Sequence, residues 1–206
     1  MSNAKATAAR AAEQPPVFRR ATKEDAFDLA RKTFLADERV DMQILASQLG
    51  IARATLHRWV QTRENLLDNV LAELTTEFFD LSRAQANGKP DDVIAKTITI
   101  IVNTTARFEP VRGFVRREPE LALRLLVGER FAVRRRLLAS IQGLLVEVLP
   151  DEADKLRGFA ETVVQVGVAL SWPALVAGDE PSGERTAKIC RALLTAARAG
   201  ALPAEA

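Results

Sequence analysis

The sequence predicts an all-α protein, with an N-terminal three-helix helix-turn-helix unit followed by a C-terminal helical bundle. Apolar residues recur three and four positions apart along most of the chain, whereas no segment shows the period-two alternation of a strand. Proline, glycine and aspartate divide the chain into helix-length segments. With 206 residues, 48% hydrophobic and 27% charged, the chain can bury a continuous core. We expect three parts, at residues 1–21, 22–71 and 72–206.

The first part is rich in alanine and contains Pro15 and Pro16. This polar, alanine-rich composition with a pair of prolines predicts a disordered arm. The segment also lacks the apolar stretch of a secretory signal, so we expect no such signal here. Arg19 and Arg20 of this arm lie beside the first helix. Residues 1–63 carry eleven Lys and Arg against seven Asp and Glu, whereas residues 64–206 have a net charge of −2. The N-terminal end is therefore the end suited to phosphates.

The second part contains three helices before a longer one. Thr22 is expected to cap a helix at Lys23–Asp37, and Asp41 to cap a short helix that ends at Leu49 before Gly50. The inward residues are expected to be Phe27, Ala30 and Phe34 in the first helix, and Ile44, Leu45 and Leu49 in the second.

A third helix is expected at Arg53–Val60, and Thr62 is expected to cap a fourth helix that reaches about Ala86. At 1.5 Å per residue the fourth helix would be about 35 Å long, which is enough to leave the N-terminal unit and enter the bundle.

The remaining helices are delimited by turn residues. We expect a turn at residues 87–90 and a helix capped by Asp91, and Glu109-Pro110 is expected to end that helix. We expect a kink at Pro173, because a proline inside a helix removes a hydrogen bond. The expected C-terminal helices are Asp91–Phe108, a short piece at Gly113–Arg117, a helix from Pro119 to Gly128, then Glu129–Leu149, Pro150–Ala177 and Gly183–Ala199.

The two short helices joined by Gly50 and Ile51 have the layout of a helix-turn-helix. In the second of them, Leu56, Trp59 and Val60 can face the core. The outer face then carries Arg53, Thr55 and Arg58, which are suited to base edges and phosphates in a major groove. The alternative is a three-helix globule whose arginines are merely solvated.

Other classes of function find little support. Cys190 is the only cysteine and His57 the only histidine, so no disulfide and no ordinary metal site can form, as expected for a reducing cytoplasm. We find no cofactor loop and no catalytic set, and we therefore expect no enzyme, no cofactor and no metal. The longest apolar stretch, near Val163–Val176, is interrupted, so we expect a soluble protein without a membrane partner.

Residues 26–71 resemble the DNA-binding domain of the TetR family of transcriptional regulators. The matching residues are Ala30, Phe34, Leu45, Ala46, Gly50, Ile51, Thr55, Leu56, Thr62, Arg63, Glu64, Leu66 and Leu67. The departures are Ala52 for the usual Ser, His57 for Tyr, Val60 for Phe, and Glu38-Arg39 where a Gly usually ends the first helix.

The resemblance implies roles for individual residues. Arg53, Ala54 and Thr55 occupy the positions that meet bases, and the neighbouring Arg58 shares their face. His57 stands where an aromatic hydroxyl meets a phosphate, and its ring N–H could substitute. Arg63 stands where a lysine meets a phosphate. The resemblance also implies that the protein forms a homodimer and binds palindromic double-stranded DNA.

The C-terminal part would then bind an effector and form the dimer. Two stretches, FVRREPELALRLL and SWPALVAGDEPSGERTAKICRALL, look like the C-terminal domain of regulators related to the repressor of quorum-signal lactone degradation. This implies a lactone or another small amphiphilic effector. The candidate ligand-binding residues are polar or aromatic residues on apolar helix faces: Asn103, Thr104, Phe108, Phe114, Phe131, Gln165 and Trp172.

Two functions remain open. The first is a homodimeric, cytoplasmic repressor that a small molecule releases from DNA. The second is a DNA-binding module that recruits a protein partner and has no small-molecule site. A cavity of several hundred Å³ in the C-terminal domain would favour the first, and a fully packed core the second.

Overall fold

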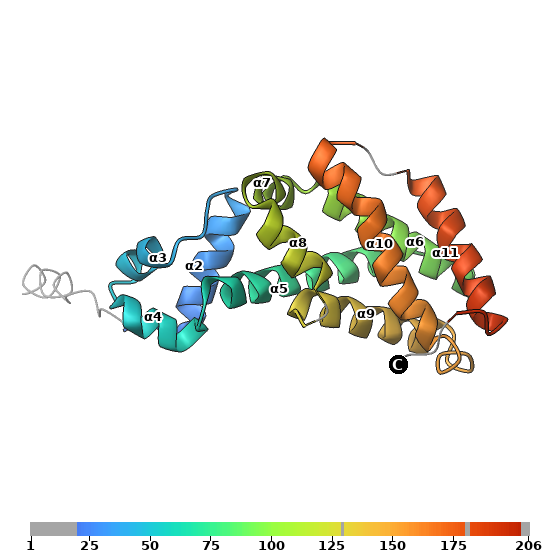
Figure 1. The fold of residues 1–206 in the computed structure, drawn as a ribbon. Coiled ribbons are helices and arrows are strands. Elements are labelled where there is room, and N and C mark those ends of the chain that lie inside the picture. Colours follow the sequence, from blue (N-terminus) through green and yellow to red (C-terminus); the bar gives the residue numbers. More distant parts are fainter. Residues whose placement is uncertain (1–19, 129, 180–181, 203–206) are drawn as a thin grey trace, which may run out of the picture.

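The computed structural model describes residues 20–128, 130–179 and 182–202. Within these residues every regular element is a helix and no strand is present, which confirms the predicted fold class (Figure 1). The ten helices are α2 (Lys23–Leu35), α3 (Met42–Gln48), α4 (Arg53–Val60), α5 (Arg63–Gln85), α6 (Pro90–Arg107), α7 (Glu109–Arg117), α8 (Pro119–Val127), α9 (Ala132–Val148), α10 (Arg157–Ala177) and α11 (Gly183–Arg198). Residues 1–19 of the expected arm lie outside the described residues.

Helices α2–α4 form the N-terminal unit. Side-chain caps begin α2 and α3 of this unit and also helix α5, whereas Ala52 before α4 offers no side-chain cap. Thr22 Oγ1 accepts a bond from the Asp25 N–H at 3.2 Å, while the Asp25 carboxylate accepts one from the Thr22 N–H at 2.7 Å. Asp41 accepts bonds from two backbone N–H groups of α3, and these bonds lower its pKa. Thr62 accepts a bond from the Asn65 N–H. The three caps predicted from the sequence are confirmed.

Helix α5 joins the N-terminal unit to the C-terminal bundle, α6–α11, as Figure 1 shows. Its first half belongs to a core that includes the N-terminal unit, where Leu66, Leu67 and Val70 are buried. Its second half belongs to the bundle core, where Phe79 is buried. The first core also contains buried residues of α7, α8 and α9. The N-terminal unit is therefore packed against the bundle rather than tethered to it.

One expected inward residue of the N-terminal unit is exposed. Ile44 is 57% exposed, because α3 packs through Met42, Leu45 and Ala46 instead. The prediction that Ile44 faces inward was wrong: both stripes of α3 are partly apolar, and the helix uses the stripe with the small Ala46.

Several boundaries in the bundle differ from those expected. Lys89, not Asp91, is the N-cap of α6, and Pro90 occupies the first turn, where its missing N–H costs nothing. Helix α6 ends at Arg107, close to the expected end before Glu109, but the next helix, α7, begins at Glu109 rather than near Gly113, with Pro110 in its first turn. Residues 150–156 form turns, and α10 begins only at Arg157.

Helix α10 continues through Pro173 to Ala177 and ends at Gly178, which has a left-handed φ of 81°. The kink expected at Pro173 stays a prediction. Among the described residues, α10 is also the one helix long and apolar enough to cross a membrane by length and composition. This is weak evidence, since core and interface helices of soluble proteins share these properties.

Candidate nucleic-acid interface and effector cavity

The turn between α3 and α4 depends on Gly50. Its φ is 63°, and a Cβ placed on it would meet no atom within 4 Å. Glycine is therefore favoured by the backbone conformation alone. The Ile51 N–H donates to the Ala46 carbonyl at 3.0 Å and closes the turn. This arrangement orients α4 against the buried face of α3.

The buried and exposed faces of helix α4 are those predicted from the sequence. Leu56 is fully buried, Val60 is 8% exposed, and Trp59 packs half-buried against the same core. The opposite face presents the candidate DNA-binding residues of α4: Arg53, Ala54 and Arg58 are exposed, and Thr55 and His57 are half-buried. The structure thus brings five of the six candidate DNA-binding residues onto one face.

Weak polar contacts arrange that face. His57 Nδ1 lies 2.9 Å from the Gln61 carbonyl oxygen, and His57 Nε2 lies 3.4 Å from Arg53 Nε. If the Nδ1–H donates to the carbonyl, Nε2 is free to accept from Arg53. Gln61 has a φ of 62° and ends the helix. His57 therefore links the end of α4 to the arginine at its start.

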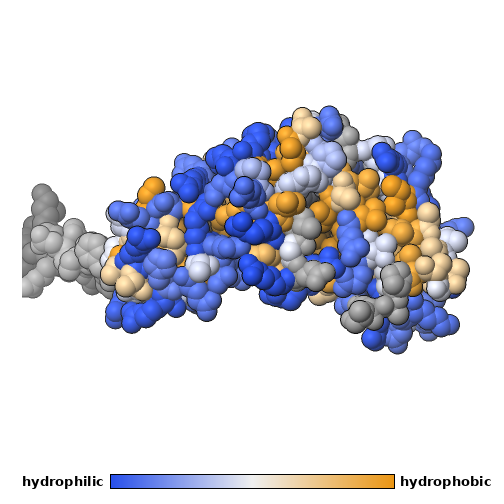
Figure 2. Space-filling view, viewed as in Figure 1, coloured by the Kyte–Doolittle hydropathy of each residue, from blue (hydrophilic) through white to orange (hydrophobic). Residues whose placement is uncertain are grey.

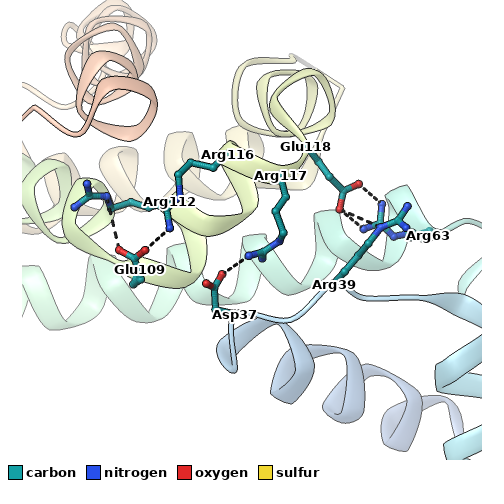
Figure 3. Close-up of polar contacts among 8 residues, drawn as sticks. All are labelled: Asp37, Arg39, Arg63, Glu109, Arg112, Arg116, Arg117 and Glu118. Atoms are coloured by element: carbon teal, nitrogen blue, oxygen red, sulfur yellow. Dashed lines mark hydrogen bonds and ion pairs between the residues drawn. The ribbon is translucent and has the colours of Figure 1, made fainter.

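Arg63, the sixth candidate, turns away from this face. Its Nη1 and Nη2 donate to the two carboxylate oxygens of Glu118 at 2.7 and 2.5 Å (Figure 3). Its Nε donates to the Val40 carbonyl. Glu118 is the N-cap of α8 in the bundle. Arg63 thus joins the N-terminal unit to the bundle, and its expected contact with a phosphate stays a prediction.

Other residues surround this pair. Arg117 Nη1 donates to Asp37 Oδ1 at 2.8 Å, and Arg39 Nε lies 3.7 Å from Glu118 (Figure 3). Asp37 has a φ of 59°, so the left-handed residue after α2 is Asp37, one position before the Glu38-Arg39 pair. We call Asp37, Arg39, Arg63, Gly113, Arg117 and Glu118 the interdomain contact.

The contact is close at Gly113 of α7. A Cβ placed on Gly113 would lie 1.9 Å from Asp37 Oδ1, so a side chain there would displace the carboxylate. Beside it, the ring of Phe114 meets the ring of Phe34 edge-on, with 5.8 Å between centroids. Both apolar packing and ion pairs therefore hold α7 and α8 to the N-terminal unit.

The C-terminal bundle contains a small apolar cavity of about 100 Å³. Its walls come from α5, α6, α8, α9 and α10, and the lining residues are Thr75, Ile98, Ile101, Val102, Thr105, Leu126, Val133, Leu137, Ile141, Val163, Val164, Gly167, Val168, Ser171, Trp172 and Leu175. Ser171 Oγ already donates to the Gly167 carbonyl, which leaves its lone pairs as acceptors. The cavity is smaller than the several hundred Å³ expected of a preformed effector site.

Of the seven candidate ligand-binding residues, the structure places only Trp172 at this cavity. Gln165 and Thr104 are exposed, and Phe108 packs edge-on against Phe78. Asn103 lies against Gly183 at the start of α11. Its Oδ1 is buried without a hydrogen-bond partner. Phe114 belongs to the N-terminal core, as described above.

Phe131 lies elsewhere, in an open cleft of about 1320 Å³ between α2, α5 and the start of α9. The guanidinium of Arg130 lies 4.7 Å from the centre of its ring. The cavity thus includes Trp172 but not the other six candidate ligand-binding residues, whose contact with an effector stays a prediction. Polar and aromatic residues were selected from the sequence, whereas aliphatic residues at helical spacing line most of the cavity.

An N-terminal helix-turn-helix, joined by one long helix to a helical bundle with a small apolar cavity, defines the class of helix-turn-helix transcriptional regulators. The sequence model of the family described as "Tetracyclin repressor-like, C-terminal domain" matches residues 90–195. The chain therefore belongs to the TetR family, whose members bind DNA operators as dimers. No protein of curated function matches the sequence.

Solved structures agree with this fold. The transcriptional repressor QsdR of R. erythropolis, of the TetR family, is 23% identical with a TM-score of 0.75, over 89% of this chain and 97% of that one. The TetR-family repressor AlkX of Dietzia sp. strain DQ12-45-1b, implicated in biodegradation of n-alkanes, is 16% identical with a TM-score of 0.62, over 87% of this chain and 96% of that one. At these identities the likeness establishes the fold alone.

Proposed function

We propose that this protein is a cytoplasmic, homodimeric repressor that binds a palindromic operator through α4 and is released by a small amphiphilic molecule. The observation that carries the proposal is the division of α4, which buries Leu56 and Val60 and exposes Arg53 and Arg58. An arginine can donate two hydrogen bonds to guanine, and a threonine can meet a thymine methyl or a phosphate. Ala54, Thr55 and His57 complete this DNA-binding face.

The homodimer would form through α10 and α11. More than half of the apolar stretch of α10 is not buried within a single chain, and Val176 is 52% exposed. Leu193 of α11 is only partly buried. Figure 2 shows apolar residues gathered over the C-terminal bundle and hydrophilic residues over most of the N-terminal unit. A second copy that covers this surface would hold two α4 helices at operator spacing.

The effector would enter the cavity beside Trp172. Aliphatic walls suit a hydrocarbon chain, and the hydroxyl groups of Thr105 and Ser171 offer hydrogen bonds to a polar head. Because the cavity holds only about 100 Å³, a chain of several carbons requires the walls to move apart. This coupling of occupancy to helix movement is what a ligand-controlled regulator needs. A lactone with a hydrocarbon chain fits this description, and the similarity to AlkX, which is implicated in biodegradation of n-alkanes, supports the choice of an apolar chain.

A selection of duplexes from a random library tests the proposal. Purified protein should enrich a palindrome, and its affinity should fall steeply with salt because arginines displace counterions from the phosphates. Enrichment of no sequence by the wild-type protein would contradict the proposed function. At about 100 Å³ the cavity is smaller than the several hundred Å³ that would favour a small-molecule effector over a recruited protein partner, so a titration with ligand decides between the two.

A further inference from the structure

The guanidinium of Arg63 is occupied within the protein. Three of its five N–H donors are used, one by the Val40 carbonyl and two by Glu118. The side chains of Arg63 and Glu118 are 21% and 17% exposed. To reach a DNA phosphate, Arg63 would have to give up the two bonds to a mostly buried carboxylate, whose remaining ion pair is with Arg39 at 3.7 Å, and this is costly.

We propose that Arg63 is a positioning residue and not a DNA contact. With Glu118 it fixes the orientation of the N-terminal unit relative to the bundle, and the pair carries the effect of an occupied cavity to α4. The coupling of the cavity to α4 rests on the proposed function, whereas the fixed orientation of the N-terminal unit is a property of the free protein.

The pair joins three elements that are distant in sequence. Val40 belongs to the connection between α2 and α3, Arg63 begins α5, and Glu118 begins α8, 55 positions further on. A fork of two parallel N–H bonds to a carboxylate has a defined geometry. The apolar contact of Phe34 with Phe114 is less directional and permits more rotation. The pair of Arg63 and Glu118 is therefore the most directional part of the interdomain contact, since Arg117 and Asp37 are joined by one bond only in the structure.

Helix α8 connects this pair to the cavity. Glu118 is its N-cap, and Leu126, near its other end, lines the cavity. The helix has nine residues, about 13 Å, and is short enough to move as a rigid body. An occupant that displaces Leu126 therefore moves Glu118 relative to Arg63.

The first test measures orientation without DNA or effector. Spin labels are attached to Ser47→Cys in α3 and Ala139→Cys in α9, both of which are exposed in the native chain. Native Cys190 stays unlabelled, because it is 1% exposed and burial raises the pKa of its thiol to about 12. Dilution with excess unlabelled chain leaves only the distance within one chain.

We expect one narrow distance distribution in the otherwise native chain and a wider one in both Arg63→Gln and Glu118→Gln. The control is Glu147→Gln, which removes a similar pair with Arg83 far from the N-terminal unit and should leave the distribution narrow. A distribution as narrow in Glu118→Gln as in the native chain overturns the proposal.

The second test uses the selected operator over a series of salt concentrations. If Arg63 positions α4, Glu118→Gln and Arg63→Gln each weaken operator binding, by about 3- to 10-fold, and the double variant is no weaker than either single variant. The salt dependence stays unchanged because no phosphate contact is lost.

The opposite outcome is equally clear. If Arg63 meets a phosphate, Arg63→Gln lowers the salt slope, while Glu118→Gln frees the arginine and tightens binding. Arg63→Lys also distinguishes the two cases, because a lysine can meet a phosphate as a point charge but cannot form the fork. Operator affinity is kept in this variant if Arg63 contacts a phosphate, and it falls if Arg63 positions α4. If the wild-type protein selects no operator, the proposed function fails, and the distance distributions still decide on the positioning role.

Discussion

Asp68 of α5 provides the cap that α9 lacks in its own sequence, by accepting bonds from the Ala132 N–H at 2.8 and 2.9 Å. It also accepts a bond from the Val133 N–H at 3.3 Å. Phe131, the residue before α9, offers no side-chain cap. A carboxylate on a neighbouring helix therefore satisfies the free N–H groups of the first turn and favours the positive end of the helix dipole.

We expect Asp68→Ala to lower the free energy of unfolding by about 1–2 kcal/mol, because the N–H groups of the first turn lose their acceptor. Urea unfolding followed by circular dichroism measures this. Asp80→Ala, at an exposed position of the same helix, is the control and should change stability little. Equal effects of the two substitutions would remove the capping role.

Arg58→Gln should weaken operator binding and reduce its salt dependence. If Arg58 meets one phosphate in each half-site, the slope of log affinity against log salt falls by about 0.9 per protomer. Fluorescence anisotropy over a salt series measures the slope. Arg83→Gln, at the far end of α5, should keep the wild-type slope. An unchanged slope in Arg58→Gln would exclude Arg58 as a phosphate contact.

Leu193→Glu should separate the dimer, since it places a charge on the partly buried face of α11. Analytical ultracentrifugation at micromolar concentration should then find a monomer. Operator affinity should fall by about 100-fold or more, because two half-sites lose their physical link. Leu123→Glu, at a 45% exposed position of α8, is the control and should remain dimeric. A wild-type monomer would contradict the proposed interface.

A Trp59→Phe protein keeps Trp172 as its one tryptophan, so its fluorescence reports on the cavity. Titration with N-decanoyl-homoserine lactone or 1-decanol should change this signal. Gly167→Leu should abolish the response by filling the cavity, since Gly167 lines its wall. Gly143→Leu places the same side chain on α9 where a Cβ meets nothing within 4 Å, and should preserve the response. A response that persists in Gly167→Leu would place the site elsewhere.

The ion pair of Glu118 should make stability depend on pH. Hydrogen bonds from Arg63 lower the pKa of Glu118, the charges of Arg39 and Arg117 act in the same direction, and burial opposes them. A lowered pKa in the folded state means that the stabilisation is present above the ordinary Glu value of about 4.3. It is lost as the pH falls through the folded-state pKa.

The difference in unfolding free energy between wild type and Glu118→Gln should therefore shrink between neutral pH and about pH 3. Urea unfolding at several pH values measures it. Glu120→Gln, at an exposed position of the same helix, should show no comparable trend. A difference that is constant over this range would mean that the carboxylate is not stabilised in its ionised form.

The sequence could predict what depends on near neighbours. Thr22, Asp41 and Thr62 cap helices within three residues of themselves, and α4 shows its buried and exposed faces in its own spacing. Asp68 and Glu118 act on partners 64 and 55 positions away, and no local pattern marks such contacts. Most of the residues that line the cavity could not be predicted from the sequence for a related reason.

The sequence predicts Trp172 as a ligand-binding residue because it is a single tryptophan on an otherwise apolar helix, where its indole N–H needs a partner when buried. The other walls of the cavity are ordinary core residues such as Ile98 and Val163. Only the packing of five helices leaves space beside them, and that depends on side-chain volumes summed over the whole bundle. A periodicity argument identifies which face is buried, but not whether the buried space is filled.

Helix α5 runs without a break through both cores, so the number of its residues determines how the N-terminal unit is rotated relative to the bundle. Each residue of an α-helix advances the chain by 1.5 Å and rotates it by about 100°. One residue inserted between Leu74 and Phe79, which are buried in different cores, would turn α4 by more than a quarter of a circle around the α5 axis. Asp68 and Arg63 would then point away from Ala132 and Glu118. Such a chain could still fold each half, yet the two α4 helices of the proposed dimer would no longer face a common DNA groove.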